Sequence, residues 1–187
     1  MPFNFTPLAL PDVILIEPRV FRDPRGFFLE TYQEADFRAA GITRSFAQHN
    51  HSFSTKGVLR GMHYQQAPYA QGKLVQVALG TVWDVAVDMR EGSSTYGKWV
   101  AAELSGENHH ALWIPPGFAH GFVVLSDSVH FLYKCTAPYT PAAERGFRWD
   151  DPDVAIDWPT REVTLSQRDQ ALPAFASAEP IKAAGAE

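Results

Sequence analysis

Residues 58–73, VLRGMHYQQAPYAQGK, lead directly into an apolar segment at residues 74–87, LVQVALGTVWDVAV. On a β-strand, alternate side chains point to the same face of the sheet. His63 has the same parity as Leu59, and Lys73 has the same parity as the valines that follow it, so we expect both polar side chains to face inward. On its own, His63 would be interpreted as a buried core histidine. A guanidinium, an imidazole and an amine within one short stretch favour a pocket inside a β-barrel instead.

The composition is that of a globular protein with an ordinary core. The chain has 187 residues, of which 45 % are hydrophobic, which is enough for one domain. Its net charge of −5 is spread without long runs of like charge, so we expect no nucleic-acid surface and no polybasic membrane patch, although a pocket could still bind an anion. Cys135 is the only cysteine, so no internal disulfide can form. No apolar run reaches the roughly 18 residues of a membrane span, and the N-terminus is unlike a signal peptide, so a cytoplasmic location is expected.

Short strands separated by glycine and proline turns make up most of the remaining chain. The predicted strands are residues 13–17, 27–31, 45–51, 73–89 with an interruption at Gly80, 98–105, 110–114, 121–125 and 128–135. A turn is predicted at residues 21–26, short helices at residues 33–40 and from Ser166, and a disordered alanine-rich tail from Ala176. We expect one all-β domain over residues 1–187. An antiparallel jelly roll is favoured over an immunoglobulin-type sandwich because polar residues recur at inward positions.

Proton transfer is the chemistry that these residue types could perform. His63 is a candidate general base because an imidazole titrates near neutral pH. Asp169 could fix its tautomer, but Asp169 ends the sequence SQRD, which is a capping box, and local sequence favours the cap. Tyr133 is either a core aromatic or a phenol that gives a proton to a carbanion. Lys73 is either a solvated charge at a strand start or a cation that stabilises an oxyanion.

Two arginines are candidates for binding an anion. Arg25 and Arg60 could each hold a phosphate, because the planar guanidinium suits bidentate recognition of oxygens, or could belong to ordinary surface ion pairs. Gly61 follows Arg60 and is a candidate β-bulge. Such a bulge would let Arg60 and His63 reach the same cavity despite their opposite parity.

Several histidines invite a metal interpretation: His49, His51, His63, His109, His110 and His120. A structural zinc site would require cysteines or a compact set of histidines and carboxylates, and the sequence contains neither pattern. We therefore expect no metal site, and we keep a metal-dependent cupin dioxygenase or isomerase as an alternative.

A family resemblance rests on these blocks: FRDPRGFFLETY, QHNHSFSTKGVLRGMHYQ, YAQGKLVQV, DVAVDMREGSSTYGKW, WIPPGFAHGFVVLSD, LYKCT, ERGFRWDDP and LSQRD. From about residue 13 to residue 175, the chain resembles the dTDP-4-dehydrorhamnose 3,5-epimerase family of the cupin superfamily. PPGFAH is also similar to the second cupin motif, whereas the first motif, with its metal ligands, is absent around His63. The resemblance implies a cupin-type jelly roll that works without a metal or other cofactor. Met62 replaces the usual leucine, and Ala137 and Pro138 precede Tyr139 where the family more often has a polar residue and an aromatic.

The resemblance implies a role for each matching residue. His63 would be the proton acceptor, with Asp169 as its orienting partner, Tyr133 the proton donor, and Lys73 the group that stabilises the enolate. The arginines would bind the diphosphate and Tyr139 would stack on thymine. The implied substrate-binding residues are Arg25, Glu30, Gln48, Asn50, Arg60, His120, Tyr139, Glu144 and Arg168. The implied assembly is a homodimer in which a strand or arm of the partner completes each site.

The implied reaction converts dTDP-4-dehydro-6-deoxy-D-glucose to dTDP-4-dehydro-L-rhamnose, because a C4 ketone acidifies the C–H bonds at C3 and C5. A mono-epimerase acting at one of these carbons would use the same acid and base and is an open alternative. A non-catalytic sugar-nucleotide-binding cupin is the other, and it would be expected to lack His63, Asp169 or Tyr133.

Overall fold

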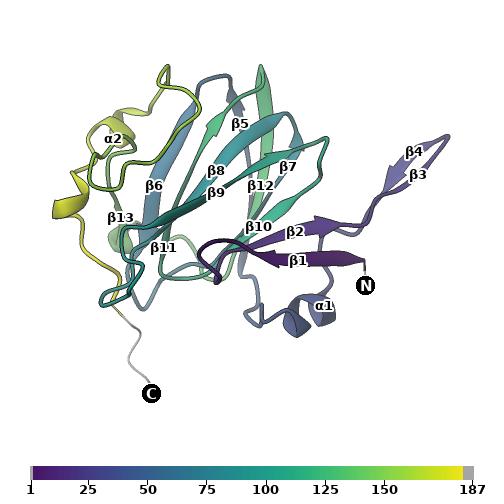
Figure 1. Ribbon diagram of the computed structural model, residues 1–187, viewed down its shortest axis with the longest axis horizontal. Coiled ribbons are helices and arrows are strands. Elements are labelled where there is room, and N and C mark those ends of the chain that lie inside the picture. The colour runs from purple at the N-terminus through teal and green to yellow at the C-terminus, as the bar shows by residue number, and fades with distance from the viewer. Residues whose placement is uncertain (1, 183–187) are drawn as a thin grey trace.

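The computed structural model describes residues 2–182, in which two antiparallel β-sheets face each other (Figure 1). The larger sheet has the strand order β1 (Phe3–Pro7), β2 (Ile14–Pro18), β10 (Ala111–Ile114), β7 (Lys73–Leu79), β12 (Ser128–Cys135) and β5 (Gln48–Thr55). The smaller sheet has the order β13 (Glu144–Gly146), β6 (Leu59–Gln65), β11 (Phe118–Val124), β8 (Thr81–Asp88) and β9 (Trp99–Ser105). The predicted all-β antiparallel architecture is confirmed. Strands β1 and β13 were not predicted.

Two apolar clusters hold the sheets in place. The first fills the space between the sheets and includes Val75, Val82, Phe122 and Phe131. The second lies on the other face of the smaller sheet and includes Leu59, Met62, Val85, Phe147 and Trp158. Because both faces of the smaller sheet are covered, β11 is buried along its whole length. The side chains of β6 and β11 therefore stand on a sheet that is packed from both sides.

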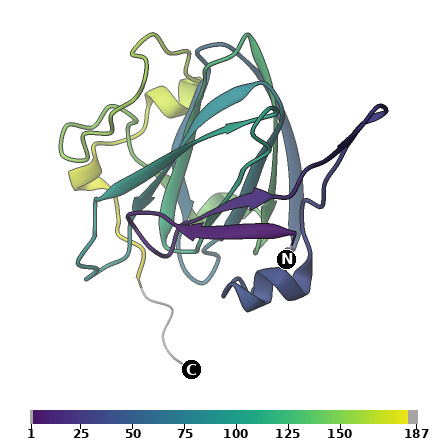
Figure 2. The same ribbon diagram turned by 45° about the vertical axis from the view of Figure 1, so that its right-hand side comes forward.

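A hairpin of β3 (Phe21–Asp23) and β4 (Gly26–Phe28) projects from the body of the molecule (Figures 1 and 2). Every residue in both strands is exposed. The turn predicted over residues 21–26 is therefore wrong in extent, because only Pro24 and Arg25 separate the paired strands. Gly26 has a φ of 127°, a conformation that side-chain-bearing residues rarely adopt.

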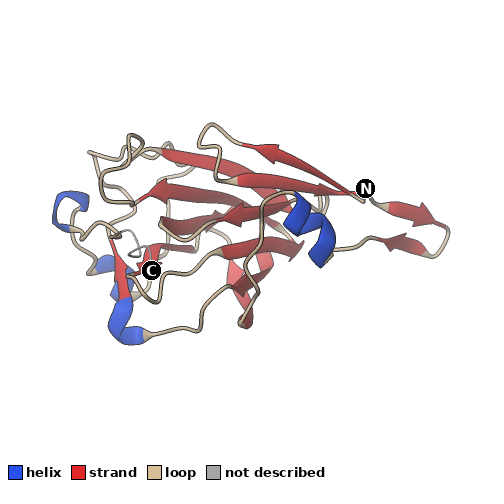
Figure 3. Cartoon of the chain, turned by 90° about the horizontal axis from the view of Figure 1, so that it is seen from below, coloured by secondary structure: helices blue, strands red, loops and turns tan. Residues whose placement is uncertain are grey.

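The predicted first helix is confirmed as α1 (Glu34–Ala39), which lies below the larger sheet in Figure 1 and is coloured blue in Figure 3. The side-chain oxygen of Gln33 accepts a hydrogen bond from the backbone amide of Asp36 at 2.8 Å and so caps the helix. Phe37 is fully buried, and its ring lies edge-on to those of Phe3 and Tyr32. The helix is thus held by one aromatic anchor.

The C-terminal segment packs along the outer face of the smaller sheet (Figure 1). It contains η1 (Pro141–Ala143), α2 (Gln167–Gln170), which confirms the helix predicted from Ser166, and η2 (Phe175–Ser177). The disorder predicted from Ala176 is wrong as far as residue 182, because Ile181 is buried and its amide donates to the carbonyl of Met89 at 2.6 Å. Residues 183–187 of that tail lie outside the described residues. The assignment of residues 1–187 to one domain stays a prediction, and no helix within residues 2–182 is long and apolar enough to cross a bilayer.

Candidate active site

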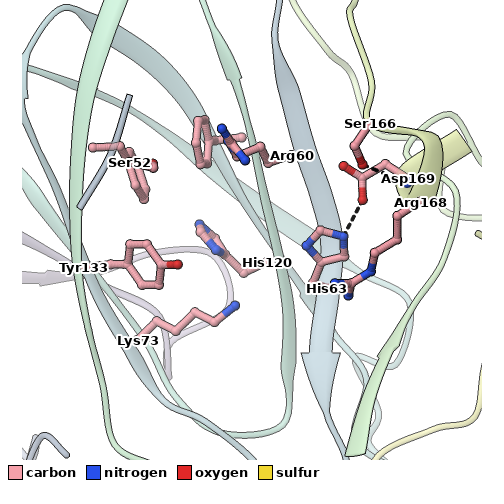
Figure 4. Close-up of a pocket in the computed structure, with 11 residues that line it drawn as sticks. Ser52, Arg60, His63, Lys73, His120, Tyr133, Ser166, Arg168 and Asp169 are labelled. Carbon is pink, nitrogen blue, oxygen red and sulfur yellow. Dashed lines mark hydrogen bonds and ion pairs between the residues drawn. The ribbon is translucent and has the colours of Figure 1, made fainter. Parts of the chain in front are cut away.

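A cavity of about 230 Å³ opens between the two sheets, and residues from both sheets and from α2 line it (Figure 4). Its polar lining residues are Ser52, Arg60, His63, Lys73, His120, Tyr133, Ser166, Arg168 and Asp169. Figure 4 shows Tyr133 and His63 on opposite sides of this space, with His120 between them and Lys73 below. The stretch at residues 58–73 therefore contributes a guanidinium, an imidazole and an amine to one cavity, as its sequence predicts.

A β-bulge at Gly61 brings Arg60 and His63 to the same side of strand β6. His63 pairs with His120 of β11 and Arg60 pairs with Phe122, so β6 advances three residues while β11 advances two. A Cβ atom at Gly61 would lie 2.6 Å from the Cα of Gly121, which is too close for any side chain. The predicted bulge is confirmed.

The same bulge corrects the parity argument for His63. Leu59 shares its parity but packs in the cluster on the outer face of the smaller sheet, whereas His63 lines the cavity. The inward direction of His63 was predicted correctly for the wrong reason, because alternation does not continue through a bulge.

His63 is paired with Asp169, which α2 supplies. Nε2 of His63 lies 2.6 Å from Oδ1 of Asp169, and the side chains are 23 % and 5 % exposed, respectively. Burial alone would raise the pKa of Asp169, but the hydrogen bond and charge of His63 bring that pKa below its usual value. The hydroxyl of Ser166 accepts a hydrogen bond from the backbone amide of Asp169 at 3.1 Å. Ser166 therefore caps the helix through the Asp169 amide, whereas the Asp169 carboxylate pairs with His63 instead of completing the capping box. The role of Asp169 as the orienting partner of a base stays a prediction.

Tyr133 and Lys73 stand on neighbouring strands of the larger sheet, facing the smaller one. Burial raises the pKa of the Tyr133 phenol, which keeps it in the protonated form that can donate. Burial lowers the pKa of the Lys73 amine, while the nearby Cys135, Asp84 and Glu144 act in the opposite direction. A protonated phenol and an amine thus lie on the wall of the cavity opposite His63.

His120 makes a second histidine–carboxylate pair with Asp84, a residue that the sequence analysis missed. Nε2 of His120 lies 2.9 Å from Oδ2 and 3.1 Å from Oδ1 of Asp84. Burial raises the pKa of Asp84 and lowers that of His120, and each partner opposes the shift of the other. The signal was present in the sequence TVWDVAV, because an acid inside an apolar strand is almost never fully buried without a partner.

An adjoining space shares His63, Lys73, Tyr133 and Arg168 with the first cavity. Its further lining residues are Gln48, Asn50, Gln71, Cys135, Tyr139 and Glu144. The Tyr139 hydroxyl donates to Glu144, which is also ion-paired with Arg168, and Oε1 of Gln48 accepts from the Tyr139 amide at 2.8 Å. These contacts tie the predicted nucleotide-binding residues together at one end of the cavity.

Two predicted site residues lie elsewhere in the chain. The Arg25 side chain is 90 % exposed and forms an ion pair with Asp23 in its own hairpin. Glu30 follows β4 and is also exposed. Neither residue lines the cavity described above.

Of the six histidines considered for a metal site, His63 and His120 line the cavity and the other four do not. His49 and His51 point away from the side of β5 that carries Gln48 and Asn50, and Nε2 of His51 lies 2.9 Å from Nδ1 of His130. Within residues 2–182, no group of three or more histidine, cysteine, aspartate or glutamate side chains is arranged to hold a metal ion. The geometry instead suits proton transfer across the cavity, with a paired imidazole on one wall and a phenol on the other.

Sequence comparison finds the same family as the motifs. A family model described as dTDP-4-dehydrorhamnose 3,5-epimerase matches residues 7–177. The chain is 56 % identical over 176 residues to the dTDP-4-dehydrorhamnose 3,5-epimerase of Pseudomonas aeruginosa, an alignment that covers 93 % of this chain and 97 % of that one.

Solved structures of similar chains support the cupin-type assignment. The dTDP-6-deoxy-D-glucose-3,5-epimerase of Legionella pneumophila, crystallised with dTDP-4-keto-L-rhamnose, superimposes with a TM-score of 0.92 at 46 % identity, covering 97 % of this chain and 100 % of that one. A 3'-monoepimerase from Streptomyces bikiniensis, crystallised with dTDP-quinovose, gives a TM-score of 0.86 at 35 % identity, covering 91 % and 87 % of the two chains. Both crystal structures contain a bound dTDP-sugar. The name of the first enzyme specifies epimerisation at two carbons, and the name of the second specifies one.

Proposed function

The chain belongs to the dTDP-4-dehydrorhamnose 3,5-epimerase family, and from that membership we propose that it converts dTDP-4-dehydro-6-deoxy-D-glucose to dTDP-4-dehydro-L-rhamnose. The family match over residues 7–177 and the high identity to 3,5-epimerases support this activity. The observation that carries the mechanism is the placement of the His63–Asp169 pair and Tyr133 across one cavity that Lys73 also lines.

We propose that His63 removes the proton at C3 or C5. The C4 ketone acidifies both C–H bonds, and negative charge moves to the C4 oxygen as the proton leaves. Lys73 then stabilises this oxygen, because a cation held in a partly dry cavity interacts strongly with a developing oxyanion. Asp169 accepts a hydrogen bond from His63 and stabilises the imidazolium that forms. The reaction involves no net oxidation or reduction.

Tyr133 returns a proton from the opposite face of the sugar ring and so inverts the carbon. Its pKa, which burial raises, suits a donor that must stay protonated until the enolate forms. Two such rounds, one at each carbon, give the L-rhamno configuration. Arg168 is assigned to the diphosphate end, together with Gln48, Asn50 and Glu144 of the adjoining space, and Tyr139 to the thymine. Arg60, which lines the first cavity, is assigned to the diphosphate from the family resemblance alone.

Inversion at both carbons is favoured over inversion at one by the relatives with more than 50 % identity, whose names specify positions 3 and 5. The 35 % identical monoepimerase keeps the same overall fold, so selectivity depends on details that the fold does not determine. Incubating the keto sugar nucleotide with enzyme in D₂O and following the products by NMR decides the matter. Deuterium at C3 and C5 with the L-rhamno product is expected, and deuterium at a single carbon would establish the mono-epimerase.

A homodimer with shared sites is part of the proposal. Arg25 and Glu30 lie outside the cavity of their own chain, next to a projecting hairpin whose Phe27 and Phe28 are 55 % and 65 % exposed. A hairpin of this kind is suited to reach a second copy and place Arg25 at that copy's diphosphate site. A cytoplasmic location likewise stays a prediction.

Mixing two inactive variants tests the shared site. An Arg25→Ala subunit keeps its own His63, and a His63→Asn subunit keeps its own hairpin. Unfolding and refolding an equal mixture should restore roughly one quarter of the wild-type activity, since half of the dimers are mixed and each contains one complete site. A mixture that stays as inactive as its components would contradict the exchange of hairpins.

A further inference from the structure

Asp84 is a carboxylate buried in the middle of the smaller sheet. It lies on β8, in register with Ala102 of β9 and Phe122 of β11, and its side chain is fully buried. Its neighbours on the same face of β8 are Val82 and Ala86, which belong to the apolar cluster between the sheets. The only side chain within residues 2–182 that forms a hydrogen bond with Asp84 is His120.

A need for stability does not explain an acid at this position. Burying a carboxylate costs more free energy than a single histidine partner commonly returns, and an apolar residue would fit the surrounding cluster. Asp88, four residues further along β8 and on the same face of the strand, provides a contrast. It is equally buried but accepts hydrogen bonds from Arg90, Ser93 and Thr95, a set of donors that accounts for it completely.

The geometry of the pair favours one tautomer of His120. Nε2 lies within 3.1 Å of both carboxylate oxygens of Asp84, as expected for an N–H that points between them. Nδ1 then has no partner within residues 2–182. The fully buried side-chain polar atoms without a partner in that range are Nε1 of Trp83 and Nε2 of His109. Nδ1 of His120 is not among them, so it is open to the cavity that His120 lines.

Lys73 has a similar arrangement. Within residues 2–182, its side-chain nitrogen has no hydrogen-bond partner. This nitrogen is also not one of the fully buried unpaired atoms, so it is accessible from the cavity, beside His120 (Figure 4). The nearby carboxylates include Asp84, whose charge favours the ammonium form of Lys73. Asp84 therefore lies behind His120, which stands beside His63 on the smaller sheet, and near Lys73 on the larger sheet.

We propose that Asp84 is a positioning residue for the epimerisation. It orients His120 through Nε2, so that the Nδ1 lone pair faces the cavity and can accept a hydrogen bond from a hydroxyl of the sugar, while Asp84 itself does not line the cavity. The inference rests on the proposed function, because it assumes that the sugar occupies the cavity that His120 lines.

The test compares Asp84→Asn with Asp88→Asn as a matched control, because the two aspartates are on one face of one strand and are equally buried. Asp84→Asn should lower kcat by about 10²-fold, the size of effect expected when a group that positions the substrate is displaced by about 1 Å, and leave KM within about threefold. Its Tm should stay close to that of the wild type. Asp88→Asn should show the reverse, an unchanged kcat with a Tm lower by about 5 °C.

Two further measurements separate positioning from general damage. The ¹⁵N chemical shifts of His120 in the wild-type enzyme should report the Nε2–H tautomer, a result that does not depend on any variant folding. In a His120→Gln background, adding Asp84→Asn should change kcat by less than about threefold, since partners in one unit are not additive.

Several outcomes would overturn the inference. They are a wild-type kcat in Asp84→Asn, an equal loss of kcat in Asp88→Asn, an Nδ1–H tautomer in the wild-type enzyme, or a full additional 10²-fold loss in the His120→Gln background. Failure of the proposed function is a separate result, because it would appear as a wild-type enzyme that leaves the keto sugar nucleotide unchanged.

Discussion

The two histidine–carboxylate pairs differ in how much water reaches them. In the His63–Asp169 pair the imidazole is 23 % exposed, and its carboxylate comes from a short helix 106 residues away. In the His120–Asp84 pair the side chains are 8 % and 0 % exposed, and both stand on adjacent strands of one sheet. The first pair can exchange protons with solvent between turnovers, whereas the second is enclosed by the core.

The environments shift the pKa values of the two carboxylates in opposite directions. The pKa of Asp169 is lowered because the contribution of its histidine exceeds that of burial, and the pKa of Asp84 is raised because burial dominates. The same two residue types therefore suit two purposes, a base that gains and loses a proton in each turnover and a buried pair that holds an imidazole in place. Burial, and not residue identity, separates these roles.

His63→Asn gives the largest expected effect and tests the first half of the comparison. Loss of the base should reduce deuterium uptake from D₂O at both C3 and C5 by about 10³- to 10⁴-fold, measured by NMR. His120→Asn is the matched control, because it removes the other histidine of the cavity. This variant should still take up deuterium at C3 and C5, at a reduced rate. Wild-type exchange in His63→Asn would remove His63 from the role of base.

Tyr133→Phe tests whether the acid stands on the wall opposite His63. The base remains, so deuterium should still enter at C3 and C5, but formation of the inverted product should fall by about 10²- to 10³-fold. The comparison is between exchange and product formation in the same sample. A normal yield of product would exclude the phenol as the donor.

Asp169→Asn should lower kcat by about 10²-fold, because His63 loses the anion that stabilises its protonated form. The pH dependence of stability sharpens the contrast with Asp84. The pKa of Asp169 is lower in the folded state, so its contribution to the free energy of unfolding is present above the pKa of an unfolded aspartate, about 4, and disappears as the pH falls through the folded value. The pKa of Asp84 is raised, so its contribution is present at low pH and is lost as the pH rises.

Urea unfolding between pH 3 and pH 7 checks these signs. Relative to the wild type, Asp169→Asn should be less stable at pH 7 and should approach it in stability as the pH falls. Asp84→Asn should show no such loss at pH 7. Parallel curves for the two variants would mean that the carboxylates are in equivalent environments.

Asp88→Asn measures how much a buried carboxylate with a structural role contributes to the free energy of unfolding. Burial opposes ionisation of Asp88, but its hydrogen bonds from Arg90, Thr95 and Ser93 lower its pKa to about 2. The ionised form therefore contributes about 2 kcal/mol to the free energy of unfolding above pH 4, and this contribution is lost between about pH 4 and pH 2. Acid unfolding of Asp88→Asn should lack that step, and an unchanged acid transition would contradict the assignment.

Local sequence patterns were sufficient for much of the site. Alternation placed Lys73 and Tyr133 on inward faces, and a glycine after Arg60 was sufficient to predict the bulge. The SQRD sequence was sufficient to predict a capped helix. Each of these features depends on the pleat or on hydrogen bonds between residues a few positions apart, so a short window of sequence contains the information.

Contacts between distant segments were needed for the rest. Alternation predicted the wrong face for Leu59. No local sequence pattern connected Asp169 with His63, and only the family resemblance predicted that pair. The role of Asp84 emerged only when β8 and β11 were paired, and the exposed position of Arg25 only when the hairpin was seen to leave the body of the chain. Strand register and docking are determined by the summed burial of whole faces, an energy spread over residues far apart in the chain, and no short stretch of sequence encodes it.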